Sequence, residues 1–571
     1  MKHNKMMQKE NMSQGVSRRD VLKGAAFAGL GVLGASALSA CSPNSGDSDK
    51  QAPNTTAADI SWDKEVDILV AGTGTVIYAA IAAAEMGSDS IFVVEKDSAM
   101  FGGTSATSGG GHALAMLDVN ADEGINDTRD QVLEYLRNVG DSRMDENVQA
   151  AFVDNANAFS HFVLDTFGWL KWGHINKAFG DYYELYPGSL SGAFGHGSWY
   201  PWASETEPLM APAQWSAYRE YVDSSEVIEL SMGSSIDSLI VDDEGAVIGA
   251  IVNEGSKEMR VKANAVVLGT GGFEHDENMR RFYLPFPYYR SNGSMNNTGD
   301  AHRMGAQIGA QLAYMDTTFG NPYFDTDTEF NEGVFRYDSV GSDAFAPRGF
   351  PHSIMVNHKG NRFCDESTMY DTMNRAFGQY DTGSMEYVNI PGYWICDGNY
   401  INTFFLPGSK EGEIPDFVSQ FDSLEALADG MGIDKEALIA EVAAFNENAA
   451  AGTDPKFGRG AKEASTNTLE MMATYRLQPG AEAPTSVLGV VDTAPFYCVR
   501  YLPGMMGGTR GGLHINENSQ VLNVLGEAIG GLYAVGNCSS GVAGYWAGGA
   551  TLGQGAVMGY VAAKHITGNA S

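Results

Sequence analysis

Gly72, Gly74 and Glu95 have the residue types and the spacing that bind a dinucleotide. The two glycines come directly after the β-rich run Val66–Ala71, so the backbone can turn tightly and approach a pyrophosphate where the next helix begins. Glu95 follows Gly72 by 23 residues, at the end of the second expected strand, where a carboxylate accepts hydrogen bonds from a ribose diol. The spacing therefore predicts a nucleotide-binding strand, turn, helix and strand.

The third glycine of this fingerprint is missing. Ile77 occupies its position, although the small side chains of Ala79 and Ala80 allow the helix and the strand to stay close. A glycine turn of this kind also occurs in other α/β units. The dinucleotide interpretation consequently depends on further segments.

Other runs of small and apolar residues agree with that interpretation. Phe101–Gly111 follows the second expected strand, and its backbone amides can line a planar ring or a diphosphate. Ala265–Phe273 and Gly531–Asn537 are apolar strands that run into glycine turns, and Asn297–Gly305 begins an amphipathic helix. The last run, Gly511–Tyr560, needs a partner near the N-terminus, so the nucleotide-binding domain is expected to be split.

In this order the segments resemble the flavoproteins of the fumarate reductase and 3-ketosteroid dehydrogenase superfamily, over almost all of Val66–Tyr560. The resemblance implies FAD as the cofactor and an α/β fold with a split Rossmann-like FAD-binding domain at 62–317 and 490–571. An inserted α+β capping, or catalytic, domain is expected at 318–489. The resemblance places these residues against FAD: Gly72, Gly74, Glu95, Lys96, Gly102, Gly103, Thr104, Ser105, Gly109, Gly110, Gly271, Gly272, Asn537, Thr551 and Leu552.

Two positions separate this chain from the fumarate reductases. In their pattern an arginine that delivers the proton follows an RFxxE element, whereas here Arg362–Glu366 is followed by Tyr370. Their Asn-Arg-x-Gly-Gly motif is replaced by Gly544–Gly549. Carboxylates in a dry pocket are costly unless cations compensate them. A clamp for a dicarboxylate substrate is therefore poorly supported.

The same positions are similar to the 3-ketosteroid Δ1-dehydrogenases. Thr509–Leu513, Ala534–Asn537 and Tyr545–Gly553 resemble that family's TKGGL, AAGN and YPGxGxTIG elements. Within the last of these, Trp546-Ala547 replaces the family's Pro-Gly. Gly180–Leu185 is similar to the family's DYYPEL region, without its proline. These matches indicate a neutral ketone as the substrate group.

The resemblance also implies catalytic roles. Removing hydrogens from the two carbons beside a ketone needs a base for the α-proton, a flavin to accept the β-hydride, and donors to the carbonyl oxygen. Tyr370 is the implied proton-transfer residue and Tyr182 its support, with the neighbouring Tyr183 as the alternative. The Tyr545 hydroxyl and the Gly549 amide are implied to hold the carbonyl. Because a free phenol has a pKa near ~10, the site must lower it or use Tyr370 as an acid in the reverse direction.

Composition and spacing exclude other classes of protein. The net charge of −35, from 71 acidic and 36 basic residues, argues against nucleic acid, whose binding requires basic patches. The four cysteines after residue 41 form no CxxC pair and no CxxCH haem site, so they are expected to be buried thiols. Metal-ligand spacing and a Gly-x-Ser-x-Gly motif are also missing from the sequence. No metal is expected.

The first 41 residues are interpreted as an export signal. Ser17–Lys23 contains paired arginines before the apolar stretch Gly24–Ala40, and this arrangement resembles a twin-arginine signal. Leu38–Cys41 is similar to a lipoprotein cleavage box, so Cys41 is expected to carry a lipid anchor; the alternative is a plain cleaved signal. The polar segment 42–61 is expected to be a tether. The protein is consequently expected in the cell envelope, anchored on the outer side of the cytoplasmic membrane.

These observations predict an exported FAD oxidoreductase that acts on a carbon–carbon bond conjugated to a ketone, with a 3-oxosteroid-like substrate. Both dehydrogenation and enone reduction fit the residues. Because the chain has no haem motif, a separate quinone or cytochrome is expected to exchange electrons with it. Two alternatives stay open: a respiratory reductase of another α,β-unsaturated acid, such as fumarate or an aromatic acrylate, and a non-catalytic flavin lipoprotein that relays electrons.

Overall fold

The structure, a computed structural model, describes most of the chain after residue 59. The described residues are 60–118, 127–140, 143–175, 199–326, 349–406, 409, 413–462, 465, 469, 477–542 and 548–569. The expected export signal and almost all of the expected tether fall outside this range. Within it, no helix is both long and apolar enough to cross a membrane.

Strand β1 (Lys64–Ala71), helix α1 (Ile77–Glu85) and strand β2 (Ile91–Glu95) form the expected strand, helix and strand. The two strands are parallel, and Ala71 lies beside Val94 in their register. All five residues of β2 are buried, which is typical of a parallel strand covered on both faces. The apolar runs that predicted these strands therefore lie inside a sheet, with β9 beside β1 and β6 beside β2.

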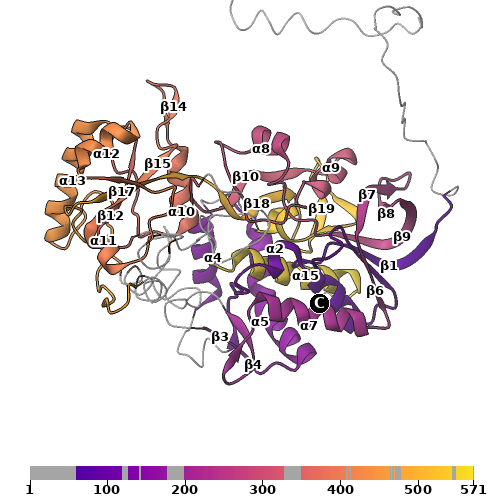
Figure 1. The fold of residues 1–571 in the computed structure, drawn as a ribbon. Coiled ribbons are helices and arrows are strands. Elements are labelled where there is room, and N and C mark those ends of the chain that lie inside the picture. Colours follow the sequence, from indigo (N-terminus) through magenta and orange to yellow (C-terminus); the bar gives the residue numbers. More distant parts are fainter. Residues whose placement is uncertain are drawn as a thin grey trace, which may run out of the picture. The chain divides into compact units, whose positions relative to one another are not determined.

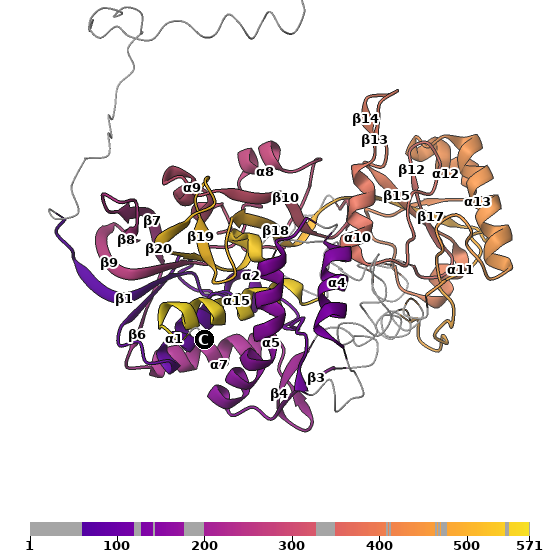
Figure 2. The same ribbon diagram turned by 180° about the vertical axis from the view of Figure 1, so that it is seen from behind.

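The sheet around this unit takes its strands from both ends of the described chain. Its order is β19-β20-β9-β1-β2-β6, and the hairpin β7-β8 is attached through β8. β20 pairs in parallel with β9, with Tyr533 beside Val267. The C-terminal run thus completes the domain that the first strands begin, as Figures 1 and 2 show. The further strands of the sheet are β6 (Ile228–Met232), β7 (Ser234–Val241), β8 (Val247–Glu254), β9 (Lys257–Leu268), β19 (Gln520–Leu522) and β20 (Ala528–Ala534).

Helices α1 and α15 (Ala550–Ile566) pack against each other. Glycines of α15 make this close approach possible, because a Cβ on Gly555 would lie 2.5 Å from Thr75 Oγ1. The glycines of the C-terminal run are therefore needed for helix packing as well as for a ligand. The other helices and small strands of this domain are α2 (Gly103–Ala106), α4 (Arg129–Val139), α5 (Glu146–Phe167), α7 (Ala211–Ser224), α8 (Glu277–Tyr283), α9 (Asp300–Gln307), β3 (Lys171–Gly173), β4 (Tyr200–Ser204) and β5 (Glu207–Pro208).

Two antiparallel strands connect this domain to the inserted domain, which we call the cap. β10 (Leu312–Gly320) leads to the cap and β18 (Met505–Leu513) leads back from it, and the two strands pair with each other. Just beyond them, Asn321 N donates a hydrogen bond of 3.0 Å to Gly504 O. The two crossings between the domains, near 320–323 and 502–505, therefore lie side by side.

The cap contains a sheet with two buried faces. Its strand order is β11-β17-β15-β12, and β16 also pairs with β17. Alternate residues of β15 enter different apolar clusters: Tyr393 and Ile395 join the cluster with α12 and α13, whereas Trp394 and Cys396 join the one with α11. The elements of the cap are β11 (Tyr323–Phe324), β12 (Ser353–Asn357), α10 (Tyr370–Arg375), β13 (Tyr380–Asp381), β14 (Glu386–Tyr387), β15 (Gly392–Cys396), α11 (Gly398–Thr403), β16 (Ser419–Phe421), α12 (Leu424–Met431), α13 (Lys435–Ala450) and β17 (Phe496–Leu502).

Strand β17 lies beyond the boundary expected for the cap. The sequence assigns it to the segment 490–571 of the FAD-binding domain, yet it pairs with β11, β15 and β16. By the pairing of its strands, the chain leaves the cap and returns to the FAD-binding domain between Leu502 and Met505, rather than at residue 489. Only two residues separate β17 from β18, so no linker composition marks the crossing.

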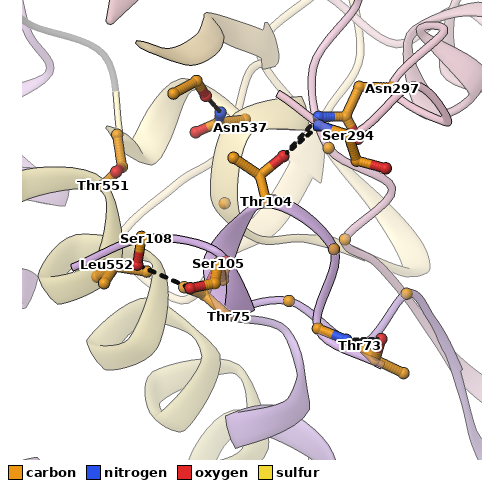
Figure 3. Close-up of a pocket in the computed structure, with 18 of the residues that line it drawn as sticks. Thr73, Thr75, Thr104, Ser105, Ser108, Ser294, Asn297, Asn537, Thr551 and Leu552 are labelled. Atoms are coloured by element: carbon orange, nitrogen blue, oxygen red, sulfur yellow. Dashed lines mark hydrogen bonds between the residues drawn. The ribbon is translucent and has the colours of Figure 1, made fainter. Parts of the chain in front are cut away.

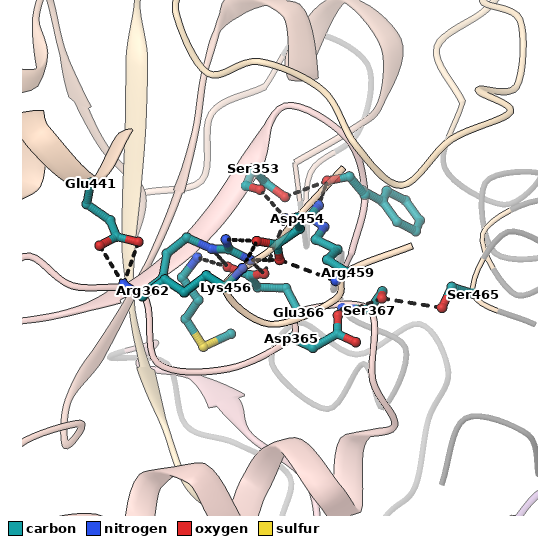
Figure 4. A network of polar contacts seen from close by, with 12 residues as sticks. Ser353, Arg362, Asp365, Glu366, Ser367, Glu441, Asp454, Lys456, Arg459 and Ser465 are labelled. Carbon is teal, nitrogen blue, oxygen red and sulfur yellow. Dashed lines mark hydrogen bonds and ion pairs between the residues drawn. The ribbon is translucent and has the colours of Figure 1, made fainter. Parts of the chain in front are cut away.

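A buried charge network holds the loop that leads to Tyr370 (Figure 4). Arg362 donates to Glu366 through Nε at 2.8 Å and Nη2 at 2.5 Å, and to Asp454 at 3.1 and 3.0 Å. The three side chains are 1 to 3% exposed. Arg459 donates two more hydrogen bonds of 2.7 Å, to the backbone carbonyls of Ser353 and Phe350. The RFxxE element therefore stabilises the cap instead of facing a substrate.

Candidate active site

One cavity brings the glycine-rich segments together. Its walls come from the turns after β1, β9 and β20, the end of β2, the run 102–111, the segment 294–300 and the start of α15. Phe319 of β10 and Tyr370 of the cap helix α10 also line it. The empty space, which includes open solvent at the mouth of the cavity, is about 1530 Å³. The segments predicted to bind the dinucleotide therefore meet at one cavity.

All but one of the residues placed against FAD from the sequence line this cavity. Gly272 is the exception. A Cβ there would lie 2.3 Å from Thr509 Oγ1 and 2.4 Å from Glu274 Oε2, so the missing side chain is required by packing behind the wall. The residues of the predicted set that line the cavity are Gly72, Gly74, Glu95, Lys96, Gly102, Gly103, Thr104, Ser105, Gly109, Gly110, Gly271, Asn537, Thr551 and Leu552.

The turn after β1 requires glycine. Gly72 has φ +105, a conformation that favours glycine, and a Cβ on it would lie 2.4 Å from Gly269 O. Thr73 is buried beside it. Its hydroxyl donates to Glu95 Oε2 at 2.6 Å and accepts a hydrogen bond of 2.7 Å from Gly102 N. One hydroxyl therefore joins three segments of the cavity wall.

Glu95 is the acceptor expected for ribose hydroxyls, and it is 8% exposed. Burial raises the pKa of Glu95, and hydrogen bonds from the Asp97 amide and from Thr73 oppose that rise. The adjacent Lys96 forms a 3.0 Å ion pair with Asp300 and donates to Thr298 Oγ1 at 2.9 Å. Because Lys96 is already paired, Glu95 stays available to accept hydrogen bonds from a diol.

The helices α1 and α15 begin at the cavity without a side-chain cap. Their N-cap residues are Val76 and Gly549, and neither helix has a capping side-chain hydrogen bond. By contrast, Asp145, Ser423 and Asp434 cap helices α5, α12 and α13. In α1 the amides of Ile77, Tyr78 and Ala79 donate to carbonyls of the preceding turn, so the attraction there comes from the positive end of the helix dipole. Such an end suits a diphosphate or a negatively charged ring. Together with the glycine walls, these helix ends fit FAD.

Figure 3 shows how the hydroxyl-bearing part of the wall is held. Thr104 Oγ1 accepts hydrogen bonds from Ser294 N at 2.8 Å and from Asn297 Nδ2 at 3.1 Å. Asn297 Nδ2 also donates to the buried Glu274 at 2.6 Å. On another side of the cavity, Asn537 Nδ2 donates to a backbone carbonyl at 2.8 Å. The polar groups of the wall are therefore preorganised.

His112 supports the same wall from behind. Its Nδ1 lies 3.1 Å from Gly110 O, to which Gln214 Nε2 also donates at 2.8 Å. Because a carbonyl only accepts, Nδ1 carries the proton, and Nε2 accepts from the Tyr78 hydroxyl at 3.3 Å. Burial lowers the pKa of His112 to about 4. The ring is therefore neutral at pH 7 and has a structural role.

Tyr370 and Gly549 are the predicted catalytic residues within the described chain, and both line the cavity. Tyr370 is 2% exposed at the first position of α10, and its ring meets Phe319 edge to face, with 5.6 Å between centroids. Gly549 has φ +90, and its carbonyl accepts hydrogen bonds from Ala113 N at 2.9 Å and Gly553 N at 2.8 Å. Among the described residues, none accepts a hydrogen bond from the Gly549 amide, which leaves it available to a ligand.

The remaining predicted catalytic residues lie outside the described residues. They are Tyr182, with its alternative Tyr183, and Tyr545; Trp546 and Ala547 also lie there. The roles given to them from the sequence stay predictions.

Some lining residues were not expected from the sequence. Ser234, Ser235 and Ile236 reach the cavity because β7 folds back through β8 onto β9, and no local motif marks them. Phe319 gives no signal either, since it is one aromatic residue in a strand. Asn297 does have a signal in the sequence, because it begins Asn297–Gly305, one of the segments that carry the resemblance to the flavoprotein superfamily.

The chain matches the FAD binding domain family over residues 67–552. It is 30% identical to 4-oxocyclohexanecarboxylate 2-dehydrogenase of Sinomonas cyclohexanicum, over 88% of this chain and 93% of that protein. It is 28% identical to 3-oxosteroid 1-dehydrogenase of Mycobacterium tuberculosis, over 88% of this chain and 98% of that protein.

The fold is similar to that of 3-ketosteroid Δ1-dehydrogenase from Sterolibacterium denitrificans in complex with 1,4-androstadiene-3,17-dione. The TM-score is 0.75 at 24% identity, covering 89% of this chain and 100% of that chain. This similarity confirms the predicted α/β architecture, a Rossmann-like FAD-binding domain with a capping domain. The chain therefore belongs to the FAD binding domain family and is an FAD-dependent oxidoreductase of the kind that acts on CH–CH groups.

Proposed function

We propose that the protein is an exported oxidoreductase that dehydrogenates or reduces the carbon–carbon bond conjugated to a ketone, on a 3-oxosteroid-like substrate. The observation that carries this proposal is that Tyr370 and the Gly549 amide line the same cavity as the glycine walls. A phenol that can move a proton and an N–H that can hold an oxygen share one space with the cofactor site. Chemistry beside a ketone needs both groups at once.

Each residue then has one task. Bound FAD supplies the two-electron oxidation or reduction at the carbon β to the ketone. Tyr370 takes the α-proton during dehydrogenation, or gives its phenolic proton to the α-carbon during reduction. The Gly549 N–H, together with the Tyr545 hydroxyl, donates to the ketone oxygen and stabilises the charge that develops there. Tyr182 supports Tyr370.

The charges of the described wall favour a neutral substrate group. Lys96 is the one cationic side chain among the described lining residues, and Asp300 already pairs with it. A carboxylate that leaves water needs an unpaired cation. The two relatives described above are, by name, dehydrogenases of a 4-oxocyclohexanecarboxylate and of a 3-oxosteroid. Both names contain a ring ketone, and the first also contains a carboxylate. A ring ketone therefore fits better than fumarate.

Two further parts of the proposal, export and a separate electron partner, are supported by the sequence. The paired arginines before an apolar stretch and the lipoprotein-like box at Cys41 support transport of a folded flavoprotein and a lipid anchor. A chain without a haem motif exchanges electrons with a separate carrier, for which we propose a quinone or a cytochrome. Fractionation of the producing cells, with Cys41→Ser as the comparison, tests the anchor: the variant should leave the membrane fraction.

The substrate class is tested by anaerobic reoxidation. The purified protein is reduced with a viologen, and the flavin absorbance is followed after addition of 3-oxo-Δ1 steroids, 3-oxo-Δ4 steroids, fumarate or an aromatic acrylate. We expect reoxidation by a 3-oxo steroid. Reoxidation by fumarate or the acrylate alone would replace the proposal with an acid reductase, and no reoxidation by any of the four would favour an electron relay.

The role of Tyr370 is tested by Tyr370→Phe. Removal of the phenolic proton should lower turnover about 10²–10⁴-fold, while the flavin spectrum and occupancy stay unchanged. Tyr400→Phe is the matched control, because Tyr400 is another buried phenol of the cap and its hydroxyl has no partner among the described residues. The control should keep full activity. Loss of flavin from Tyr370→Phe would instead assign Tyr370 a structural role.

A further inference from the structure

Asp371, the residue after Tyr370, connects the cap helix α10 to the FAD-binding domain. Its side chain is 2% exposed. Oδ1 accepts a hydrogen bond of 2.7 Å from Gly320 N, at the end of β10. Oδ2 lies 3.1 Å from Arg510 Nη2. Both oxygens of one carboxylate therefore bind the two strands that connect the domains.

Arg510 is the partner of Asp371 on strand β18, and it is fully buried. Its guanidinium donates to Thr318 O from Nε at 3.1 Å and from Nη2 at 2.5 Å. It also lies over the Phe319 ring, 5.4 Å from the centroid, and that ring meets Tyr370 edge to face. Arg510 thus contacts both the backbone and the aromatic side chain next to Tyr370.

A second polar contact fixes the same helix at the other crossing. Asn374 Oδ1 accepts a hydrogen bond of 3.2 Å from Gly504 N. Gly504 O in turn accepts from Asn321 N at 3.0 Å. Helix α10 is therefore bonded at both points where the chain passes between the FAD-binding domain and the cap.

These bonds are needed to place Tyr370. A helix of six residues is too short to hold its own geometry, so its direction is set by its contacts. A buried ion pair contributes little stability compared with apolar residues of the same size, but it fixes one relative arrangement of its partners. Tyr370 lines the cavity from the first position of this helix, so the position of α10 relative to β10 and β18 decides where its hydroxyl lies.

We infer that Asp371 and Arg510 form a positioning pair that sets Tyr370 relative to the cofactor cavity. The inference rests on the proposed proton-transfer role of Tyr370. Neither Asp371 nor Arg510 is among the described residues that line the cavity, so the pair acts through the helix and through Phe319. Its contribution lies in the rate of proton transfer and not in substrate binding.

The variants Asp371→Asn, Arg510→Gln, Arg510→Lys and the double variant Asp371→Asn/Arg510→Gln test the pair. We expect Asp371→Asn and Arg510→Gln, which each remove one charge of the pair, to lower kcat per bound flavin about 10- to 100-fold. Misplacement of a reacting group by about 1 Å has an effect of this order. KM and flavin occupancy should stay near the wild-type values. The double variant should lose no more than the worse single variant, since both remove one interaction.

Arg510→Lys is the conservative variant. Lysine keeps the charge opposite Asp371 but cannot also make the forked contact with Thr318 O. Its kcat should therefore lie between those of the wild type and Arg510→Gln. A purely structural role would lower the melting temperature or flavin occupancy of all variants without this order in kcat.

Asp454→Asn is the matched control, because Asp454 is another buried aspartate paired with an arginine, in the cap network of Figure 4. It should lower the melting temperature while kcat per flavin stays unchanged. Wild-type kcat in Asp371→Asn, or an equal loss of kcat in Asp454→Asn, overturns the positioning inference. Full activity of Tyr370→Phe overturns the proposed function itself, whatever the pair variants do.

Discussion

Thr73 Oγ1 donates a 2.6 Å hydrogen bond to Glu95 and accepts one of 2.7 Å from Gly102 N. Thr73 stands between the two glycines of the first turn. Thr73, Glu95 and Gly102 all line the cofactor cavity. The glycines allow the backbone to turn, but this hydroxyl fixes the distance between the turn, the end of β2 and the wall 102–111. The sequence pattern GTG therefore contains a side-chain function as well as a backbone one.

Thr73→Val should weaken FAD binding about 5- to 150-fold. Valine has nearly the same shape, but it leaves the buried Gly102 N–H and one Glu95 oxygen without their partner, which costs about 1–3 kcal/mol. The measurement is the dissociation constant for FAD of the deflavinated protein. Thr73→Ser, which keeps the hydroxyl, is the control, and equal affinities of the two variants would contradict the bridging role.

Gly549→Ala should disturb the start of α15. The residue has φ +90, and the added Cβ would lie 2.6 Å from Gly111 O and 2.9 Å from Ala113 N, so backbone must move. We expect a lower melting temperature and lower FAD occupancy in the purified variant, both measured by flavin absorbance and thermal unfolding.

Gly568→Ala is the control for Gly549→Ala, because it separates the cost of the backbone conformation from the cost of contact with neighbouring atoms. Gly568 follows the same helix with φ +74, but a Cβ there meets no atom within 4 Å. It should show only the conformational cost of a left-handed residue, about 1–2 kcal/mol, with normal FAD occupancy. If both glycine variants lose FAD equally, contact with the wall is not the cause.

The parts of the fold that could be predicted from the sequence are those with local causes. The strand ending at Ala71, the helix after Thr75 and the strand ending at Glu95 follow from apolar runs, glycine turns and an acid at a fixed spacing. The cavity-lining residues Gly271 and Asn537 follow in the same way, because each stands where an apolar strand ends.

The parts that could not be predicted depend on sheet topology and packing. Ser234–Ile236 reaches the cavity through the order of three strands, and no pattern within β7 shows this. Gly272 looks like another wall glycine but is required by Glu274 and Thr509 behind the wall. The partners of β17 could not be read from its own residues, because any apolar strand can pair with several others.

The charge network of the cap should make the protein sensitive to acid. Burial raises the pKa of Glu366, but Arg362 and Arg459 outweigh it and hold this pKa below its usual range. Arg362 does the same for Asp454. A carboxyl with a lowered pKa stabilises the fold above its unfolded pKa of about 4 and loses that contribution as the pH falls through its folded pKa. Thermal unfolding from pH 7 to pH 3 should show this loss.

In Arg362→Gln the effect of acid on the contribution of Glu366 and Asp454 to stability should be reversed. At pH 7 it leaves two buried carboxylates poorly compensated and should cost about 3–5 kcal/mol. As the pH falls, the carboxyls become neutral and the deficit relative to the wild type should shrink. Lys456→Gln removes a pair in which Lys456 is 44% and Glu441 12% exposed, so it should cost less than Arg362→Gln, on the order of 1 kcal/mol. A deficit of Arg362→Gln that grows in acid would contradict the assigned pKa directions.

The four cysteines of the described domains should stay free thiols under oxidising conditions. Cys364, Cys396, Cys498 and Cys538 are free and buried. Burial raises the pKa of Cys538 to about 11 and raises the pKa values of the other three further above their usual range. Because the thiolate is the reactive form, these thiols should react slowly with a disulfide reagent at pH 8 in the native protein.

Cys396 and Cys498 are the pair whose strands are adjacent. In the register of β15 and β17, Cys498 lies beside Ile395 and Cys396 beside Tyr497, and the two thiols enter opposite apolar clusters of the cap. Side chains on opposite faces of a sheet cannot form a disulfide without backbone movement. Alkylation of Cys41→Ser under denaturing, non-reducing conditions should therefore label all four thiols, also after incubation with oxidised glutathione. A loss of two labels would show that the cap opens far enough for its strands to rearrange.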